Sequence, residues 1–332
     1  MSMNFEKMLM QSAAIVALCS CAYANPGESI TQSAPMQNQS MQANDACDKL
    51  PAAYNAPARI DVQCSWDFFL SASFTYWQAD QEAMDLAYPT AGGNVMTQEI
   101  EYKPGFKVAM GMDFDYDNWV GSVEYTWFRS ATKSHYVGAY TGTNFLDHAL
   151  TNFHSSWKAN IDLVDVMMSR PYYQGKKLTI LPFGGLRAAF IRQNLHMNDA
   201  NPAFNSAYKS HSWAVGPRGG LQAHWLLGCG FRVEGDLSGS LLFTQYDVSN
   251  GTVHFDDYNT LRPMADMGVG LGWGSYLDKQ NYHLDLLATY DFNVMFGQNM
   301  MRALAEIGNT GTSFEPAALH LQGLTLSARF DF

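Results

Sequence analysis

The sequence predicts an all-β protein, an antiparallel, transmembrane up-and-down β-barrel of about ten strands. Charged residues make up only 15% of the 332 residues, whereas aromatic residues reach 14%. No run of about 18 apolar residues follows the N-terminal region, which argues against a helical membrane protein. Apolar residues instead recur at every second position, and alternate residues of a strand face opposite sides. Each strand then has one wall for lipid and one for the lumen.

The period-two pattern begins near Trp66, where Phe68, Leu70 and Phe74 alternate with Ser71 and Thr75. Long polar stretches such as 131–155 and 245–262 follow the odd-numbered segments, and tight links follow the even-numbered ones. This asymmetry is typical of outer-membrane barrels, whose periplasmic turns are short. Ten such segments are found, at residues 66–78, 103–115, 118–130, 156–169, 177–191, 212–226, 230–244, 263–276, 281–295 and 318–332.

Some residues break the pattern. Pro182 and Pro217 fall inside predicted strands, where each removes a ladder donor, so we expect bulges there. Leu319 and Leu321 are out of phase with Leu324, which predicts another bulge near Gly323. All eight tryptophans lie in or beside predicted strands, and we expect them to favour the headgroup zone of the membrane.

The N-terminal region predicts export. Residues 1–24 combine Lys7, an apolar stretch and the small-x-small site Ala22-Tyr23-Ala24, as in a signal peptide. A buried helix or a lipoprotein signal at Cys21 are the alternatives. Residues 25–64 are polar and predict a flexible periplasmic segment, and the barrel would occupy 65–332.

Three cysteines remain after the signal peptide. Export exposes them to oxidising conditions, so Cys47 and Cys64 are a candidate disulfide, with Cys229 left over. Three unpaired cysteines are the alternative. A net charge of −11 argues against nucleic acid as a partner and permits, without showing, cation preference in a pore.

The last residues alternate up to a terminal aromatic, as Leu324, Leu326, Ala328, Phe330 and Phe332. This resembles the final strand of outer-membrane proteins, which the barrel assembly machinery recognises. The partners expected are that machinery, outer-membrane lipids, ions or small solutes and, in a homo-oligomer, further copies of the chain.

Several motifs, in order, resemble the MOMP-like (major outer membrane protein-like) pore-forming family of Legionella and the environmental chlamydiae. The resemblance covers roughly residues 65–332 and implies an outer-membrane location and pore formation. It supplies no catalytic residues. The motifs are Trp66-Asp67-Phe68-Phe69, Pro104-Gly105-Phe106-Lys107-Val108, Leu181-Pro182-Phe183-Gly184-Gly185-Leu186-Arg187, Gly216-Pro217-Arg218-Gly219-Gly220-Leu221 and Phe330-Asp331-Phe332.

The inward-facing charges are the candidate pore lining, because opposed charges along a water-filled lumen can set ion selectivity. They could also pair and close the interior, since ten strands lie near the closed end of barrel sizes. In one strand, Gly268, Gly270, Gly272 and Gly274 would leave space or permit curvature. The candidates are Lys107, Asp113, Glu124, Lys158, Arg187, Arg218, Arg232, Glu234, Asp236, Asp266, His283, Asp285 and Asp291.

Two other functions compete with a pore. Long loops such as 131–155 suit an adhesin or a structural scaffold with a plugged lumen. Loop residues Asp80, Asp85, His254, Asp256 and Asp257 permit a barrel hydrolase, but no catalytic or metal motif accompanies them. We therefore expect no enzyme activity, no cofactor and no metal.

Overall fold

The computed structural model describes residues 60, 62, 67–90, 92–114, 117–143, 145, 149–174, 177–199, 205–310 and 316–332. All of them belong to one compact unit, Cys47–Phe332. The predicted signal peptide and the candidate pair Cys47 and Cys64 lie outside the described residues, as does most of the predicted periplasmic segment. Among the described residues, no helix is long and apolar enough to cross a membrane.

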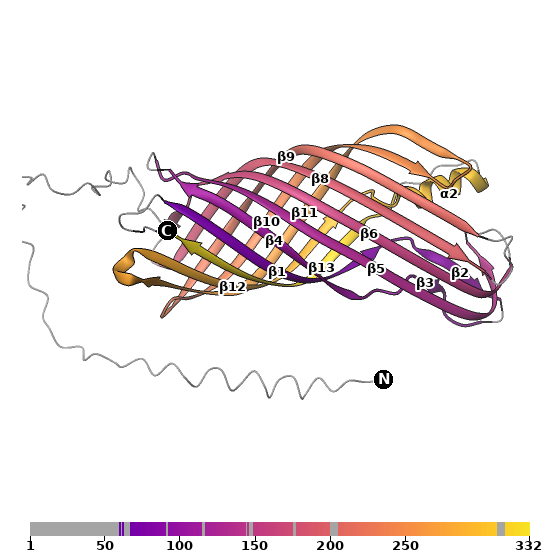
Figure 1. Cartoon of the computed structure of the whole chain (residues 1–332), viewed down its shortest axis with the longest axis horizontal. Coiled ribbons are helices and arrows are strands. Elements are labelled where there is room, and N and C mark those ends of the chain that lie inside the picture. The colour runs from indigo at the N-terminus through magenta and orange to yellow at the C-terminus, as the bar shows by residue number, and fades with distance from the viewer. Residues whose placement is uncertain are drawn as a thin grey trace, which may run out of the picture. The chain divides into compact units, whose positions relative to one another are not determined.

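Ten long antiparallel strands form a closed barrel, in the ring order β1-β4-β5-β6-β8-β9-β10-β11-β12-β13 with β13 paired back to β1. Figure 1 shows these strands winding steeply around one axis. They are β1 (Phe68–Gln81), β4 (Tyr102–Asp113), β5 (Val120–Gly142), β6 (Ala149–Ser169), β8 (Leu178–Asn198), β9 (Ser206–Gly228), β10 (Phe231–Ser249), β11 (His254–Leu277), β12 (Tyr282–Met295) and β13 (Leu319–Asp331).

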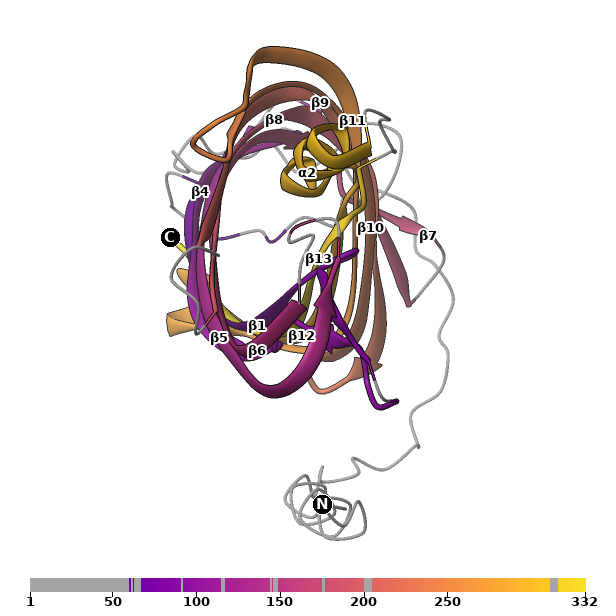
Figure 2. The same cartoon turned by 90° about the vertical axis from the view of Figure 1, so that its right-hand side faces the viewer.

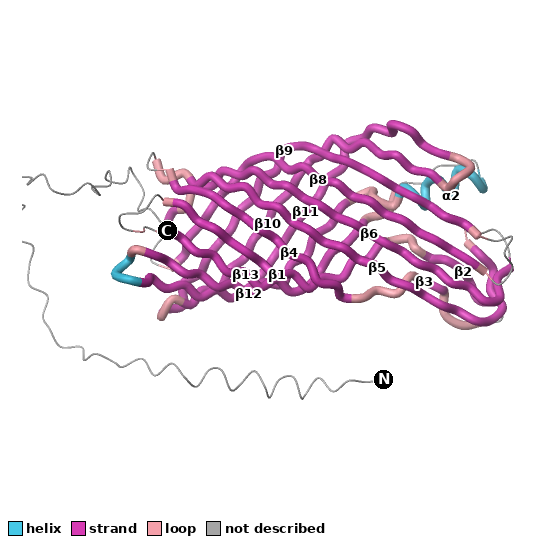
Figure 3. The backbone as a smooth tube through the Cα atoms, in the orientation of Figure 1, coloured by secondary structure: helices cyan, strands magenta, loops and turns pink. Residues whose placement is uncertain are grey.

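The short elements gather at the two ends of the barrel (Figure 3). The end that carries the tight connections after β4, β9 and β11 is called the turn end, and it includes a 3-10 helix and β7. The opposite end, called the loop end, carries two small strands and a helix. The short elements are β2 (Asp85–Pro89), β3 (Met96–Thr97), β7 (Tyr172–Gln174), η3 (Asp278–Gln280) and α2 (Met300–Thr310).

The ten predicted strands are confirmed, but the middle ones are longer than predicted. Residues 131–142 and 149–155 continue β5 and β6, and the stretch 245–262 contains only a tight turn between β10 and β11. The predicted long loops there are therefore wrong. A membrane needs about 9–11 residues per strand, so these strands, of up to 24 residues, extend beyond it at the loop end.

The outer wall carries an apolar band between two groups of aromatic side chains, as the lipid-facing side of such barrels requires. Phe231, Tyr276, Tyr282 and Phe330 lie near the turn end, and all are at least 38% exposed. The group nearer the loop end comprises Tyr76, Tyr102, Phe190, Trp213, Phe243 and Tyr290, and Tyr76 stacks on Tyr102 with ring centroids 5.3 Å apart. We call this second group the upper girdle.

The expected headgroup position is wrong for two tryptophans. Trp77 and Trp157 point into the barrel and are each 1% exposed. Both lie where the lumen is filled by apolar side chains, so their indole rings are needed inside. Trp66 lies outside the described residues.

The expected bulges are absent. The β8–β9 register runs without a shift past both Pro182 and Pro217. Near Pro217 the β9–β10 ladder lacks two pairs, from Ser240↔Arg218 to Phe243↔Val215, but keeps its register. The β13 register is also continuous through Gly323. Leu319 and Leu321 are buried inside the barrel, whereas Leu324 faces out, because the lumen itself is apolar at that level.

Candidate functional site

The turn half of the lumen holds a charged cavity of about 540 Å³. Twelve of the thirteen predicted lining residues contribute to it. Ile60, which precedes β1, also contributes, and nearby Val62 is buried. Among the described lining residues there are seven carboxylates against five lysine and arginine side chains. The carboxylates are Asp113, Glu124, Glu234, Asp236, Asp266, Asp285 and Asp291, and the cations are Lys107, Arg187, Arg218, Arg232 and Arg329.

Two arginines and two aspartates form the most buried ion-pair network. Arg187 Nε donates to Asp165 Oδ1 at 2.7 Å, and its Nη1 donates to Asp266 Oδ2 at 2.7 Å. Arg218 reaches the same two carboxylates. Arg187, Asp165 and Asp266 are each under 9% exposed. The network joins β6, β8, β9 and β11, and bidentate pairing of this kind fixes the arginine planes.

A second group of charges connects the opposite wall. Lys107 Nζ lies 3.3 Å from Asp291 Oδ2 and 4.9 Å from the centroid of the Trp77 ring. Thr325 donates to Asp291 at 2.7 Å and accepts the indole N–H of Trp77 at 3.0 Å. Lys107 therefore sits at the level where the charged cavity meets the apolar half of the lumen.

A third group lies nearer the turn end. Arg232 Nη2 donates to Asp285 Oδ1 at 2.9 Å and Arg232 also pairs with Glu234. His224 Nε2 lies 3.3 Å from Glu234. These contacts cross β9, β10 and β12, so they run over the inner side of β11 between them.

The inner side of β11 has no side chains at four alternate positions. A Cβ at Gly268 would lie 2.3 Å from Asp236 Oδ1, and one at Gly272 would lie 2.8 Å from Arg232 Cζ. At Gly274 it would lie 3.0 Å from both Asp285 and His283. The space that these glycines leave is thus occupied by the charged side chains of β10 and β12, rather than by an inserted loop.

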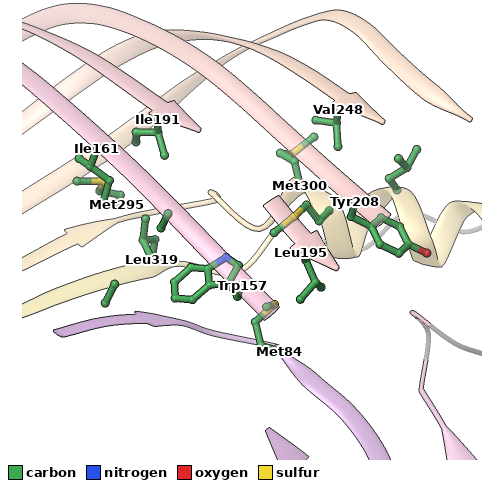
Figure 4. Packing of buried hydrophobic residues seen from close by; sticks show 14 of the residues in the cluster. Met84, Trp157, Ile161, Ile191, Leu195, Tyr208, Val248, Met295, Met300 and Leu319 are labelled. Carbon is green, nitrogen blue, oxygen red and sulfur yellow. The ribbon is translucent and has the colours of Figure 1, made fainter. Parts of the chain in front are cut away.

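The loop half of the lumen is closed by a hydrophobic core. Trp157, Ile161, Leu195, Met295 and Leu319 pack inside it, as Figure 4 shows, and each is at most 2% exposed. Residues of β2, β3 and α2 fill the centre of this core. Viewed end on, α2 lies inside the outline of the barrel (Figure 2). In the part of the chain that the structure describes, the charged cavity therefore ends at this core.

Hydrogen bonds hold the closing segments to each other. Asn299 caps α2 by accepting the N–H of Arg302 at 3.1 Å, and its amide donates to the carbonyl oxygen of Glu82 at 2.8 Å. Arg302 donates to the Ala83 carbonyl at 3.1 Å and to Glu306 at 2.8 Å. Helix α2 and the turn after β1 are thus one connected plug, which we define as residues 82–99 and 299–310.

Strand β3 and its neighbours are held to the inner wall in the same way. Gln98 donates to Thr132 on β5 at 2.9 Å and accepts from Ser155 on β6 at 2.8 Å. Tyr246 on β10 donates to Gly297 O at 3.2 Å, and burial raises the pKa of Tyr246 to about 12. Its hydroxyl therefore stays protonated and keeps donating at any physiological pH.

Glu82 joins the plug to the last strand. Its Oε1 lies 2.8 Å from His320 Nε2, and its Oε2 accepts the N–H of Ala318 at 3.0 Å. These two hydrogen bonds, chiefly that from His320, lower the pKa of Glu82 below its ordinary value. The carboxylate is thus favoured at this junction.

One predicted lining residue is placed wrongly. Lys158 is exposed on the outer wall, because Trp157 and Ala159 take the inward positions of β6. Sequence reasoning also missed four polar residues that point inward, Asp165, His224, Arg329 and Asp331. Asp165 is buried inside the barrel, whereas Asp162 on the same strand faces the outer wall and pairs with Arg129 at 2.8 Å.

A family model matches residues 61–332, and its description is the major outer membrane protein precursor of Legionella pneumophila. The chain belongs to this family. The match spans the whole barrel, and it confirms the resemblance that the sequence motifs indicated. As a member of the family, with an apolar outer wall between aromatic groups, the chain is an integral protein of the bacterial outer membrane. A search of curated proteins gave no match.

Several solved outer-membrane barrels are similar at low identity. The outer membrane protease OmpT from Escherichia coli is 10% identical, with a TM-score of 0.43, covering 83% of this chain and 99% of that one. The translocator domain of the autotransporter NalP from Neisseria meningitidis is 10% identical, with a TM-score of 0.41, covering 81% and 89%. The toluene transporter TodX of Pseudomonas putida is 7% identical, with a TM-score of 0.29, covering 80% of this chain and 88% of that one. All three TM-scores are below 0.5, so the family assignment does not depend on them.

The loop residues considered for catalysis are dispersed. Asp80 pairs in register with His320 on the outer wall, Asp85 lies 3.8 Å from Arg302, and Asp257 accepts from Gln245. His254 and Asp257 both lie at the start of β11, well separated in sequence from Asp80 and Asp85, and the Asp256 side chain lies outside what the structure describes. In the described part of the chain, no three histidine, cysteine or acidic groups are placed to hold a metal ion. The expectation of no catalysis stays a prediction.

The predicted assembly signal shares one face. Leu324, Leu326, Phe330 and Phe332 are 38–46% exposed on the outer wall, and Ala328 has the same strand phase. Its recognition by the assembly machinery remains a prediction. Cys229 lies exposed in the turn between β9 and β10.

Proposed function

We propose that the chain forms a narrow pore for ions or small solutes, and that the plug gates this pore in the loop half of the barrel. The observation that carries this proposal is the charged cavity of about 540 Å³ in the turn half of the lumen. A barrel that served only as an anchor could fill this volume with apolar side chains, as it does in the loop half.

The lining suits cations better than anions. Seven carboxylates face five lysine and arginine side chains. Among the described residues, Glu124 and Asp236 have no ion-pair partner within the cavity. Rings of unbalanced acidic side chains favour cation passage.

The plug supplies the gate in this proposal. It packs on the wall through buried apolar side chains and is hydrogen-bonded to it at β2, Gln98 and Glu82, but it belongs to connections rather than to the ten barrel strands. Segments of this kind can open without unfolding the barrel, since local opening costs less than global unfolding.

The test is conductance in planar bilayers of the full chain and of a variant in which a short Gly-Ser linker replaces residues 299–310. We expect brief, small openings from the full chain and larger, more sustained ones from the variant, with a reversal potential in a salt gradient that indicates cations. Heat-modifiable gel mobility confirms that both barrels are folded. Folded protein that is silent in both forms would overturn the proposal.

A scaffold or adhesin with a closed lumen is the second candidate, and the hydrophobic core of the loop half favours it. That core contains fully buried Trp77, Trp157 and Leu304. Silence of the linker variant would support this alternative.

A further inference from the structure

One quadrant of the outer wall collects cations that the pore does not use. Beyond the upper girdle, β5, β6, β8 and β9 continue toward the loop end and carry a group that we call the basic patch. Its lysine and arginine members are Lys133, Lys158, Arg192 and Lys209, and all four are exposed.

Strand register brings these residues together. Lys158 is paired with Asn194, two residues from Arg192 on β8, and Asn194 is paired with Lys209 on β9. Lys133 is paired with Ser156, two residues from Lys158. Neighbouring strands lie about 4.8 Å apart and two residues along a strand span about 6.6 Å, so the four cations share one continuous surface.

Four histidines fill positions among them. His211 is paired with Arg192, and His196 with Ser156. His135 is paired with His154, and their rings stack with centroids 4.0 Å apart. These rings add hydrogen-bond donors to the surface without adding a carboxylate.

The patch is not neutralised by neighbouring acids that the structure describes. Asp162 forms an ion pair with Arg129. Asp199 accepts hydrogen bonds from the backbone N–H groups of Thr151 and Asn152. Asp247 lies at the edge, paired in register with His211. In the described ranges, the four lysine and arginine side chains have no ion-pair partner, although the whole chain has a net charge of −11. At the same level, the β1 side of the barrel carries Asp80 and Glu82 instead.

The position of the patch along the barrel axis indicates the kind of partner that it suits. Phe190 and Trp213 of the upper girdle are paired with each other, and Arg192 and His211 follow them by two residues on the same strands. Aromatic girdles mark the depth of lipid headgroups. The cations therefore begin where the apolar part of a lipid ends and its headgroup starts.

We propose that the basic patch is a binding site for the phosphate-bearing headgroup of an anionic lipid in the outer leaflet. The acyl chains would lie on the apolar band below Phe190 and Trp213, and the phosphate would be held by Arg192, Lys158 and Lys209. Lysine and arginine near a membrane surface each contribute about 1 kcal/mol to anionic lipid binding.

Two charge-matched variants test the proposal. Arg192→Gln with Lys209→Gln removes two cations from the patch, and Arg170→Gln with Lys177→Gln removes two near the turn end. Native mass spectrometry of the full chain in detergent doped with phosphatidic acid or phosphatidylcholine counts the retained lipid. We expect the wild-type protein and the turn-end variant to retain phosphatidic acid preferentially, and the patch variant to bind it about 30-fold more weakly. Heat-modifiable mobility confirms folding in each case.

Competition separates lipid from other anions. Inorganic phosphate and heparin are added to the phosphatidic acid sample at matched ionic strength. Retention that survives both supports a lipid site. Equal losses in the two variants, or no preference for phosphatidic acid over phosphatidylcholine, would overturn the proposal. Displacement by heparin together with weak lipid retention would overturn it in favour of a polyanion surface.

Discussion

The two halves of the lumen use the same ten strands in opposite ways. In the turn half, inward positions carry charges such as Arg187 and Asp266, which pair around a cavity. In the loop half, inward positions of those strands carry Ile191 and Met264, which pack on a plug. In a closed barrel the backbone N–H and C=O groups are hydrogen-bonded between strands in both halves. Side chains alone therefore decide whether the interior is filled or hollow. The same scaffold therefore combines a hollow, charged half and a filled, apolar half.

The largest effect is expected from breaking the network in the turn half. Arg187→Met would leave Asp165 and Asp266 short of a partner in a site where all three are under 9% exposed. Removing one partner of a buried pair typically costs about 3–5 kcal/mol. Urea unfolding in vesicles should show that the free energy of unfolding falls by an amount of this order. The loss should be somewhat smaller because Arg218 stays near both carboxylates.

The control for that change is Lys158→Met, which removes a cation of the outer wall. It should alter the free energy of unfolding by no more than about 0.5 kcal/mol. Equal effects of the two substitutions would show that the buried network does not stabilise the turn half.

The plug should be the next most sensitive region. Met301 is fully buried on α2, and Met→Ala in a core costs about 2–5 kcal/mol. Because α2 takes no part in the barrel ladder, we expect the loss to appear first as faster proteolysis and amide exchange of α2, with the barrel still folded. Met267→Ala is the matched control, since Met267 is 47% exposed on the outer wall. Simultaneous loss of the barrel and the plug would contradict two separable halves.

The smallest effect concerns pH at the junction of plug and barrel. Glu82 has a lowered pKa through its hydrogen bonds to His320 and Ala318. Its stabilisation is therefore present above the ordinary glutamate value near 4.5 and is lost as pH falls through the lowered pKa. The side chain is half exposed, so the contribution is at most about 1 kcal/mol.

Glu82→Gln isolates this contribution, because the opposite shift of Asp80, whose pKa is raised by burial, remains in both proteins. The difference in unfolding midpoint between wild type and variant should shrink as pH falls below 4.5. A difference that stays constant with pH would assign the effect to packing instead.

Alternation predicted the turn half well, because lipid-facing and lumen-facing residues there differ in polarity. Twelve of the thirteen predicted lining residues face the cavity for this reason. In the loop half the rule reverses: Ser130, Thr132 and Ser134 point inward while Lys133 and His135 point to solvent. On this part of β5 both walls are polar, so the period-two signal vanishes there and the strand extension was not predicted.

The same reversal explains the misplaced residues. Alternation predicts Lys158 on the inner wall only if the outer position is apolar, but β6 has left the membrane at that level and Trp157 fills the core. Helix α2 was not predicted, although its sequence is amphipathic, and most of its described side chains are buried against the barrel walls. Only tertiary packing reveals that these segments lie inside the barrel.

The glycines of β11 have a consequence for how this interior can change. Gly268, Gly272 and Gly274 carry no charge, yet each is the position over which a charged neighbour lies. A single added methyl group there would displace Asp236, Arg232 or Asp285 rather than merely occupy space. The electrostatic pattern of the cavity is therefore set as much by neutral positions on one strand as by the charges on its neighbours. Substitutions that leave net charge untouched can therefore rearrange the charges of this interior.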